Sequence, residues 1–300
     1  MTEDEFAAYQ SLSEETEDHR WAFGTGFTDP LEGVDATVPD GVDARALAAY
    51  CLMLGDDALI YSHRLQQWMT HMPELEEETA LANIALDLLG QARMLLARAG
   101  QAEGALLAEG NGRGEDELAF FRDEHEFRNV RLAEHLDADF AELAGRLLVF
   151  SAWRLALFGR LAGSKDPVLA AIAAKGVNEL TYHRDYAAGW VIRLGDGTPL
   201  SHDRMQAALA AIWPLVEELF RVDPVTSGLP WVAADPVDLR AEVEAALGAV
   251  LAAATLDRPQ AAPLAQVAGK SGRDGVHTEA FGYLLAELQS VARAHPDATW

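Results

Sequence analysis

One stretch, residues 80–99 (ALANIALDLLGQARMLLARA), constrains the fold of this chain more than any other. When it is drawn as a helix, apolar side chains fall on nearly every side, so we expect a helix enclosed by other helices rather than one on a surface. A polar line, Asn83, Asp87 and Gln91, follows it at a spacing of four residues and therefore shares one face. An unpaired buried polar group costs about 1 to 3 kcal/mol, so this line must meet a facing helix, a water molecule or a metal.

Composition excludes several classes of partner. The chain has 300 residues, half of them hydrophobic, which is enough for a large core. Its formal net charge is -25 and only three residues are lysine, so no broad basic face is available for nucleic acid. The acidic amino terminus does not resemble a secretory signal, and no apolar run reaches the roughly 20 residues that span a bilayer. The single Cys51 cannot form an intrachain disulfide, and we expect a cytoplasmic protein that binds neither nucleic acid nor membrane.

Helical periodicity runs through the chain from residue 42 onward, and no stretch alternates at period two for long enough to predict a strand. Caps, prolines and glycines mark the helix ends. The predicted helices are residues 43–69, 74–100, 139–162, 166–194, 201–220, 238–256 and 277–294. Between the second and the third, residues 100–117 predict a loose glycine-rich link. Residues 118–135, whose charges alternate in sign, predict a solvated helix or an ordered loop.

Two long helix pairs in succession, each with a polar interruption midway, are typical of a ferritin-like four-helix bundle core. We therefore predict an all-α protein in which this core carries additional C-terminal helices. Residues 41–300 are expected to form a single ferritin-like helical domain. Residues 1–40 combine an acidic opening with a Gly- and Pro-rich portion, and we expect a partly ordered amino-terminal extension there.

The ligand pattern of a di-iron ferritin-like protein is absent from the sequence. Such proteins use a Glu from each of two helices and a Glu-x-x-His motif from each of the other two. No Glu-x-x-His occurs in this chain, and residues 143–165 contain no Asp, Glu or His. Glu179 and His183 are four residues apart, a spacing compatible at most with a mononuclear metal site. We therefore expect no metal and no catalytic residue in this chain.

The inward polar residues instead predict a buried polar network where a metal site could once have been. Its members are Asp56, Asp57, Asn83, Asp87, Gln91, Glu179 and His183. Arg154, in the middle of the third helix, is a candidate partner for their charges. His63 lies two turns beyond Asp56, and we expect a core histidine that is hydrogen-bonded to a neighbour.

Five runs of sequence carry a resemblance to a known family. They are LGDDALIYSHRLQQW, PELEEETALANIALDLLGQARMLL, ELAFFRDEHEFRNVRL, DPVLAAIAAKGVNELTYHRDYAAGWVIRLGDGT and GVHTEAFGYLLAELQ. In their order and spacing they resemble the phenylacetic acid degradation family of ferritin-like proteins. The resemblance covers about residues 43–300, whereas residues 1–42 lie outside it.

This resemblance implies a subunit of a bacterial multicomponent monooxygenase that epoxidises the ring of phenylacetyl-CoA. In such a complex a catalytic paralogue holds a di-iron centre, a reductase delivers electrons from NADPH, and small accessory subunits are present. The resemblance implies that this chain pairs with the catalytic paralogue as a structural subunit and holds no iron. The absent ligand pattern points to the same role independently.

Two other functions remain open on the residues alone. One is a divergent di-iron or di-manganese oxidase, active by itself, that would use Asp56, Asp87, Glu179 and His183. The other is a homodimeric binding protein with no redox role. Metal content would separate the first from a structural subunit, and co-purification with a catalytic paralogue would separate the second.

Two further features bear on binding. The glycine-rich loop at residues 269–275 carries Lys270 and Arg273, which could hold a coenzyme A phosphate, although a mobile connector is the simpler interpretation. Large apolar residues on helices that already have a core side predict a hydrophobic face for the catalytic paralogue, or for a second copy when the chain is alone. These residues are Trp68, Met69, Met72, Trp153, Phe158 and Leu161.

Overall fold

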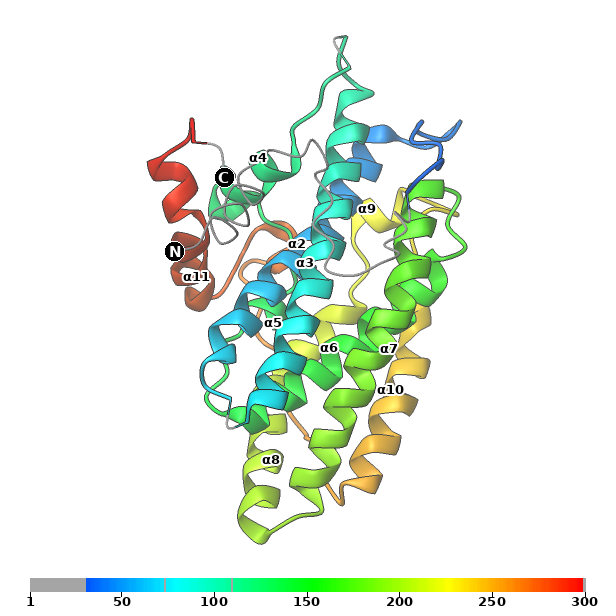
Figure 1. Cartoon of the computed structure of the whole chain (residues 1–300). Coiled ribbons are helices and arrows are strands. Elements are labelled where there is room, and N and C mark those ends of the chain that lie inside the picture. The colour runs from blue at the N-terminus through cyan, green and yellow to red at the C-terminus, as the bar shows by residue number, and fades with distance from the viewer. Residues whose placement is uncertain (1–30, 73, 109, 299–300) are drawn as a thin grey trace, which may run out of the picture. The chain divides into compact units, whose positions relative to one another are not determined.

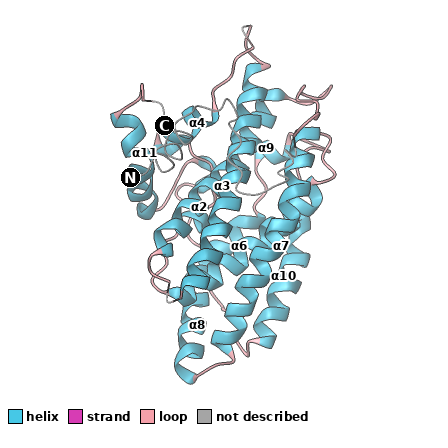
Figure 2. Cartoon of the chain, viewed as in Figure 1, coloured by secondary structure: helices cyan, strands magenta, loops and turns pink. Residues whose placement is uncertain are grey.

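The computed structural model describes residues 31–72, 74–108 and 110–298, and residues 33–300 belong to one compact unit. The described residues are helices and loops, with one isolated bridge between Val267 and Lys270 in place of any strand (Figure 2). This confirms the all-α class. Most of the expected amino-terminal extension, residues 1–30, lies outside the described residues.

Four long helices make up the core of the fold. They are α2 (Ala44–Met69), α3 (Leu75–Gly104), α6 (Phe140–Leu161) and α7 (Pro167–Gly195). Helix α2 packs along α3 and α6 along α7, and α3 also contacts α7 (Figure 1). The rings of Tyr61 in α2 and Phe150 in α6, 4.3 Å apart between centroids, join the two pairs. This arrangement agrees with a ferritin-like core.

Shorter elements surround these four helices. Between α3 and α6 lie α4 (Glu115–Phe120), η1 (Glu124–Glu126) and α5 (Arg131–Glu134). After α7 come α8 (Pro199–Ile212), η2 (Trp213–Phe220), α9 (Pro224–Ser227), α10 (Pro236–Ala253), η3 (Gly272–Asp274) and α11 (Glu279–Ala294). Helices α8 and α10 pack on α6 and α7, whereas α11 packs on α4, α2 and α5 (Figure 1). The additional C-terminal helices are therefore present, on two different sides of the core.

Local caps explain where the long helices begin. The carboxylate of Asp43 accepts the backbone N–H of Arg45 at 2.8 Å, and that of Asp166 accepts the N–H of Leu169 at 2.8 Å. Asp139 caps α6 in the same way. Such side chains satisfy N–H groups that have no partner inside the helix. These starts agree with those predicted from the sequence.

The end of α3 differs from the prediction. The helix does not stop at Gly100 but continues to Gly104, and the link that follows packs closely against it. A Cβ atom on Gly100 would collide with the carbonyl oxygen of Arg113, and one on Gly112 with that of Gly100. Glycine here allows two backbones to touch rather than ending a helix. The link predicted to be loose is therefore tightly packed where it meets α3.

The 118–135 segment is an ordered and largely buried loop with short helical turns, not a solvated helix. Leu118, Phe127 and Val130 are fully buried. Its charged side chains are buried too, and Arg122 forms an ion pair with Asp56 of α2. The alternating charges thus meet buried partners instead of water, which the pattern of signs alone does not distinguish.

Helix α3 is not enclosed on all sides as expected. It buries Leu81, Leu88 and Leu95 but leaves Leu75 and Leu86 exposed, by 72% and 56%. Among the described residues it is also the one helix long and apolar enough to cross a membrane by length and composition, so the expectation of no such run fails by that criterion. Its packing against α2 and α7 accounts for this apolar composition.

Candidate functional site

A guanidinium group lies where the four long helices meet. Arg154 of α6 is fully buried, and its Nε donates to Oε1 of Gln91 in α3 at 2.9 Å. Its two terminal nitrogens lie 3.3 and 3.2 Å from the carbonyl oxygen of Leu54 in α2. Burial lowers the pKa of Arg154 to about 10, so the side chain still carries a positive charge at neutral pH.

Helix α7 completes this group. Nε2 of Gln91 donates to Oε2 of Glu179 at 2.9 Å, and the other carboxylate oxygen lies 3.2 Å from Nζ of Lys175. One turn away, Nε2 of His183 lies 3.0 Å from Oδ2 of Asp87. His183 is fully buried whereas the Asp87 side chain is 37% exposed, so this pair lies at the edge of the α3–α7 contact.

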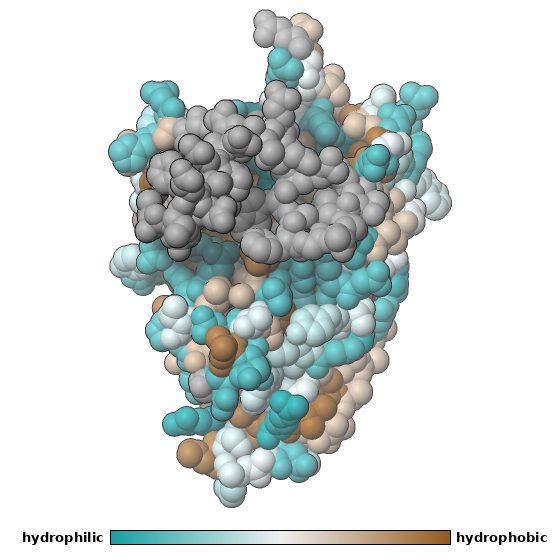
Figure 3. Space-filling model, viewed as in Figure 1, coloured by the Kyte–Doolittle hydropathy of each residue, from teal (hydrophilic) through white to brown (hydrophobic). Residues whose placement is uncertain are grey.

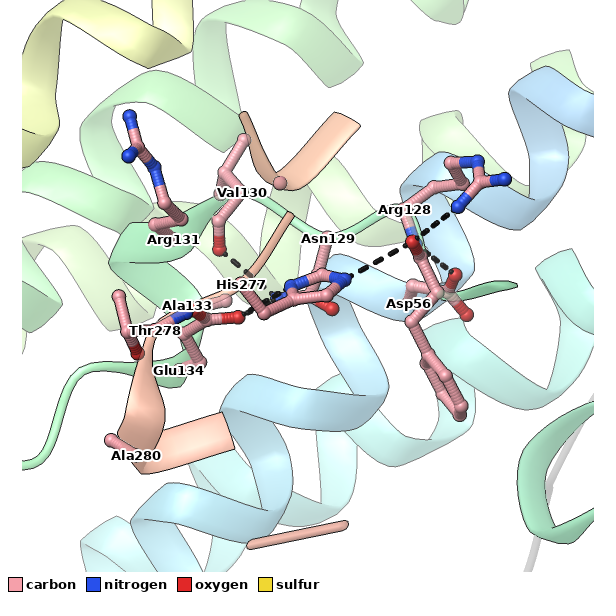
Figure 4. A network of polar contacts seen from close by, with 12 residues as sticks. Asp56, Arg128, Asn129, Val130, Arg131, Ala133, Glu134, His277, Thr278 and Ala280 are labelled. Carbon is pink, nitrogen blue, oxygen red and sulfur yellow. Dashed lines mark hydrogen bonds and ion pairs between the residues drawn. The ribbon is translucent and has the colours of Figure 1, made fainter. Parts of the chain in front are cut away.

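Asp56 and Asp57 of α2 are fully buried and bind elements outside the four long helices. The carboxylate of Asp56 is held by both terminal nitrogens of Arg122 and by the backbone N–H of Arg128 at 2.9 Å (Figure 4). That of Asp57 accepts two hydrogen bonds from Arg273, at 2.9 and 2.8 Å. Burial raises the pKa of Asp57 while Arg273 opposes the rise. The two aspartates therefore attach the 118–135 segment and the loop before α11 to α2.

A buried carboxylate–imidazole pair lies beside them. Nδ1 of His277 is 2.8 Å from Oε2 of Glu134, and its Nε2 is 3.2 Å from the carbonyl oxygen of Phe127 (Figure 4). Asn129 donates to the same Glu134 oxygen at 2.9 Å. Both ring nitrogens and the carboxylate therefore have protein partners, and we interpret the pair as a structural clamp. Sequence reasoning missed Glu134, because its partner lies 143 residues away.

Comparison with known proteins identifies the family. A family described as phenylacetic acid catabolic protein matches residues 34–300. This chain belongs to that family. It is 44% identical over 256 residues to a subunit of the 1,2-phenylacetyl-CoA epoxidase of Escherichia coli (strain K12), which covers 85% of this chain and 99% of that protein. The resemblance inferred from the sequence is confirmed.

In this phenylacetic acid catabolic protein, the predicted polar network is divided into separate groups. They lie around Arg154, at the edge of the α3–α7 contact and beneath the 118–135 segment. The predicted members are Asp56, Asp57, Asn83, Asp87, Gln91, Glu179 and His183. Asn83 is exposed, so its predicted burial is wrong. The reason is that this side of α3 faces solvent, as the exposure of Leu86 one turn away also shows.

Two other expectations fail for related reasons. The sequence predicts that Arg273 is free for a coenzyme A phosphate, but its side chain is only 10% exposed and is bound to Asp57, so it does not offer that site. Lys270 is exposed. His63 has a buried Nε2 without a hydrogen-bond partner among the described residues, so the expected bond to a neighbour is not made there. Burial lowers the pKa of His63 below its usual range.

The central residues of this family member do not fit a di-iron centre. Two iron ions require several carboxylates that are free to bind cations. Here Arg154 places a positive charge among the four helices, and Asp56 and Asp57 are each occupied by an arginine. A metal would have to displace buried ion pairs, which is strongly unfavourable.

A second place in the described residues brings metal-ligating groups together. Single ligand atoms of His135, Asp137 and Glu142 lie within 4.8 Å of one another, near the start of α6. However, the buried guanidinium of Arg146 binds both oxygens of Asp137. The charge of that carboxylate is thus already neutralised, and the cluster is better explained as a structural ion pair.

The large apolar residues divide by helix. Trp153, Phe158 and Leu161 of α6 are buried in the core, so they form no partner face. Trp68 and Met69, at the end of α2, are only half-buried. Trp68 lines an open groove of about 520 Å³ with Leu136 and Tyr283, which are 60% and 70% exposed.

Proposed function

We propose that this chain is the non-catalytic structural subunit of a bacterial multicomponent phenylacetyl-CoA 1,2-epoxidase. Arg154 carries this proposal, because a buried cation at the meeting point of the helices occupies the region that a di-iron centre would need. The 44% identity to a protein named as a subunit of that epoxidase supports the same role. In this proposal the chain takes part in phenylacetate degradation by supporting another subunit.

The cofactors of the reaction belong to the partners in this proposal. A paralogous catalytic subunit holds the di-iron centre, an NADPH-dependent reductase supplies electrons, and small accessory subunits complete the cytoplasmic complex. The alternative, a divergent di-metal oxidase active by itself, would need Asp56, Asp87, Glu179 and His183 as ligands. Asp56 is bound by Arg122, which argues against that use.

Metal content tests the proposal. The chain is expressed alone in iron-replete medium, and the catalytic paralogue is purified in the same way as the control. We expect well below one iron ion per chain here and a loaded di-iron centre in the control, because the carboxylates of this chain are held by arginines. A stoichiometric di-iron centre in this chain, with oxo-bridge absorption, would overturn the structural role.

Turnover of phenylacetyl-CoA provides the second test. The catalytic paralogue and the reductase are assayed with and without this chain. We expect stable association of the two paralogues, and turnover that depends on it. If the chain shows no affinity for the paralogue and turnover is equal without it, the proposal is wrong.

A further inference from the structure

A pocket outside the four-helix core forms between η2, α10 and the segment that follows α10. Its volume is about 270 Å³. Its inner wall is apolar and includes the buried side chains of Phe220, Leu247 and Leu251 and the half-buried ring of Trp213. None of the residues around Arg154 lines it, so it is separate from the site described above.

The outer wall is held in place by hydrogen bonds at both ends. The backbone N–H of Leu264 donates to the carbonyl oxygen of Pro214 at 2.7 Å. At the other end, the side chain of Gln206 exchanges two hydrogen bonds with the backbone of Asp257, at 2.8 and 3.0 Å. The wall does not need to be built when a ligand arrives, and a preformed pocket loses less free energy on binding.

Gly248 keeps part of this pocket open. It lies in the middle of α10, and a Cβ atom placed on it would meet nothing within 4 Å. Glycine in a helix interior costs about 1 kcal/mol relative to alanine, yet no close packing here requires it. The observed consequence of glycine at this position is free space along the pocket wall.

The rim of the pocket alternates in charge. Arg240 forms two hydrogen bonds with Glu217, at 2.6 and 3.0 Å, and lies 3.6 Å from Glu244. Arg258 donates to Glu244 at 3.0 Å, and its guanidinium lies over the ring of Trp213, 5.6 Å from the centroid. The four charges sum to zero, and the chain as a whole carries -25. An anionic ligand would therefore gain little at this rim and would be repelled by the rest of the surface.

We propose that this pocket binds an uncharged compound with a single aromatic ring and a hydroxyl or amide group. An apolar cavity of about 150 Å³ is enough to bind benzene, so this larger pocket has room for a ring and a substituent. The rings of Trp213 and Phe220 offer edge and face contacts to it. The polar group lies at the rim, where arginines donate and glutamates accept hydrogen bonds. This inference does not rest on the proposed function.

The test uses the full chain and two probes that share a ring, benzyl alcohol and benzoate. Calorimetric titration is carried out on the unchanged chain, on Gly248→Leu and on Gly159→Leu. Gly159 is the matched control, because it is also an exposed helical glycine whose Cβ would meet nothing. Leucine favours a helix more than glycine does, so both variants are expected to fold.

We expect saturable binding of benzyl alcohol to the unchanged chain and to Gly159→Leu. Its affinity should fall about tenfold or more in Gly248→Leu, because the new side chain fills the pocket. Benzoate should bind the unchanged chain about tenfold more weakly than the alcohol. Absent binding, or equal binding to Gly248→Leu, would overturn the site, and benzoate affinity equal to that of the alcohol would overturn the uncharged class.

Discussion

At the scale of single residues, buried arginines determine what the polar interior can do. Asp56 and Asp57 would be plausible metal ligands in a sequence, but each is held by a guanidinium in the structure. Arg154 also stacks over the ring of Phe158, 4.5 Å from the centroid. The acids of the interior therefore connect elements of the fold instead of presenting free charge.

Removing Asp57 should destabilise the protein strongly. Asp57→Ala leaves Arg273 with an uncompensated charge at a nearly buried position, and breaking such a pair costs about 3 to 5 kcal/mol. Urea unfolding measures the effect. The control is Asp185→Ala, which removes an exposed partner of Arg184 and should change the free energy of unfolding by at most about 1 kcal/mol. Similar losses in the two variants would contradict this account.

At the scale of elements, close backbone contact decides where α3 ends and how the next segment runs. Gly104 faces the backbone of the link, where a Cβ atom would lie 2.5 Å from the carbonyl oxygen of Gly110. The link in turn leads into α4 and the buried 118–135 segment, whose position depends on Asp56 and Asp57 of α2. Packing at the end of one helix thus helps to place the segment that covers another.

Gly100→Ala tests this contact. The methyl group would collide with the carbonyl oxygen of Arg113, and we expect a loss of about 1 to 3 kcal/mol in the free energy of unfolding. Gly90→Ala, in the same helix, is the matched control, because its Cβ would meet nothing within 4 Å. It should stabilise the protein by up to about 1 kcal/mol. Chemical denaturation of both variants decides the matter, and a neutral Gly100→Ala would count against tight packing of the link.

At the scale of the whole molecule, much of the surface is hydrophilic, and apolar residues gather in small patches on the visible face (Figure 3). The groove at the end of α2 is different in composition, since Trp68, Leu136 and Tyr283 line it together. Partly exposed aromatic residues of this kind are enriched at the centres of protein interfaces. This groove is our candidate for the contact with the catalytic paralogue.

Tyr283→Asp should weaken that contact. A carboxylate in an apolar interface loses hydration without gaining a partner, and we expect about tenfold lower affinity for the paralogue. Leu200→Asp, which changes a residue that is 64% exposed at the start of α8, should leave the affinity unchanged. Light scattering on each variant, alone and with the paralogue, measures both homodimers and mixed complexes. Equal affinity for the two variants would place the contact elsewhere.

The helices follow from the sequence because their signals are local. Asp43 as a cap and Asp166 followed by Pro167 act within one turn, so the starts of α2 and α7 were predictable. The missing Glu-x-x-His motifs were equally visible, and with them the expectation of a chain without iron. Gly100 misled the prediction, because a helix-ending glycine and a glycine in close backbone contact look alike in sequence.

Only the tertiary structure decided which charges meet. Asp56 and Arg122 are 66 residues apart, and Asp57 and Arg273 are 216 apart. No period or cap reports such a pair, because its partners come together only when the segments between them have folded. The sequence by itself therefore determined the helical class and the absence of a di-iron motif. The packed chain decided which polar groups are buried, which are bound by arginine and where an open pocket remains.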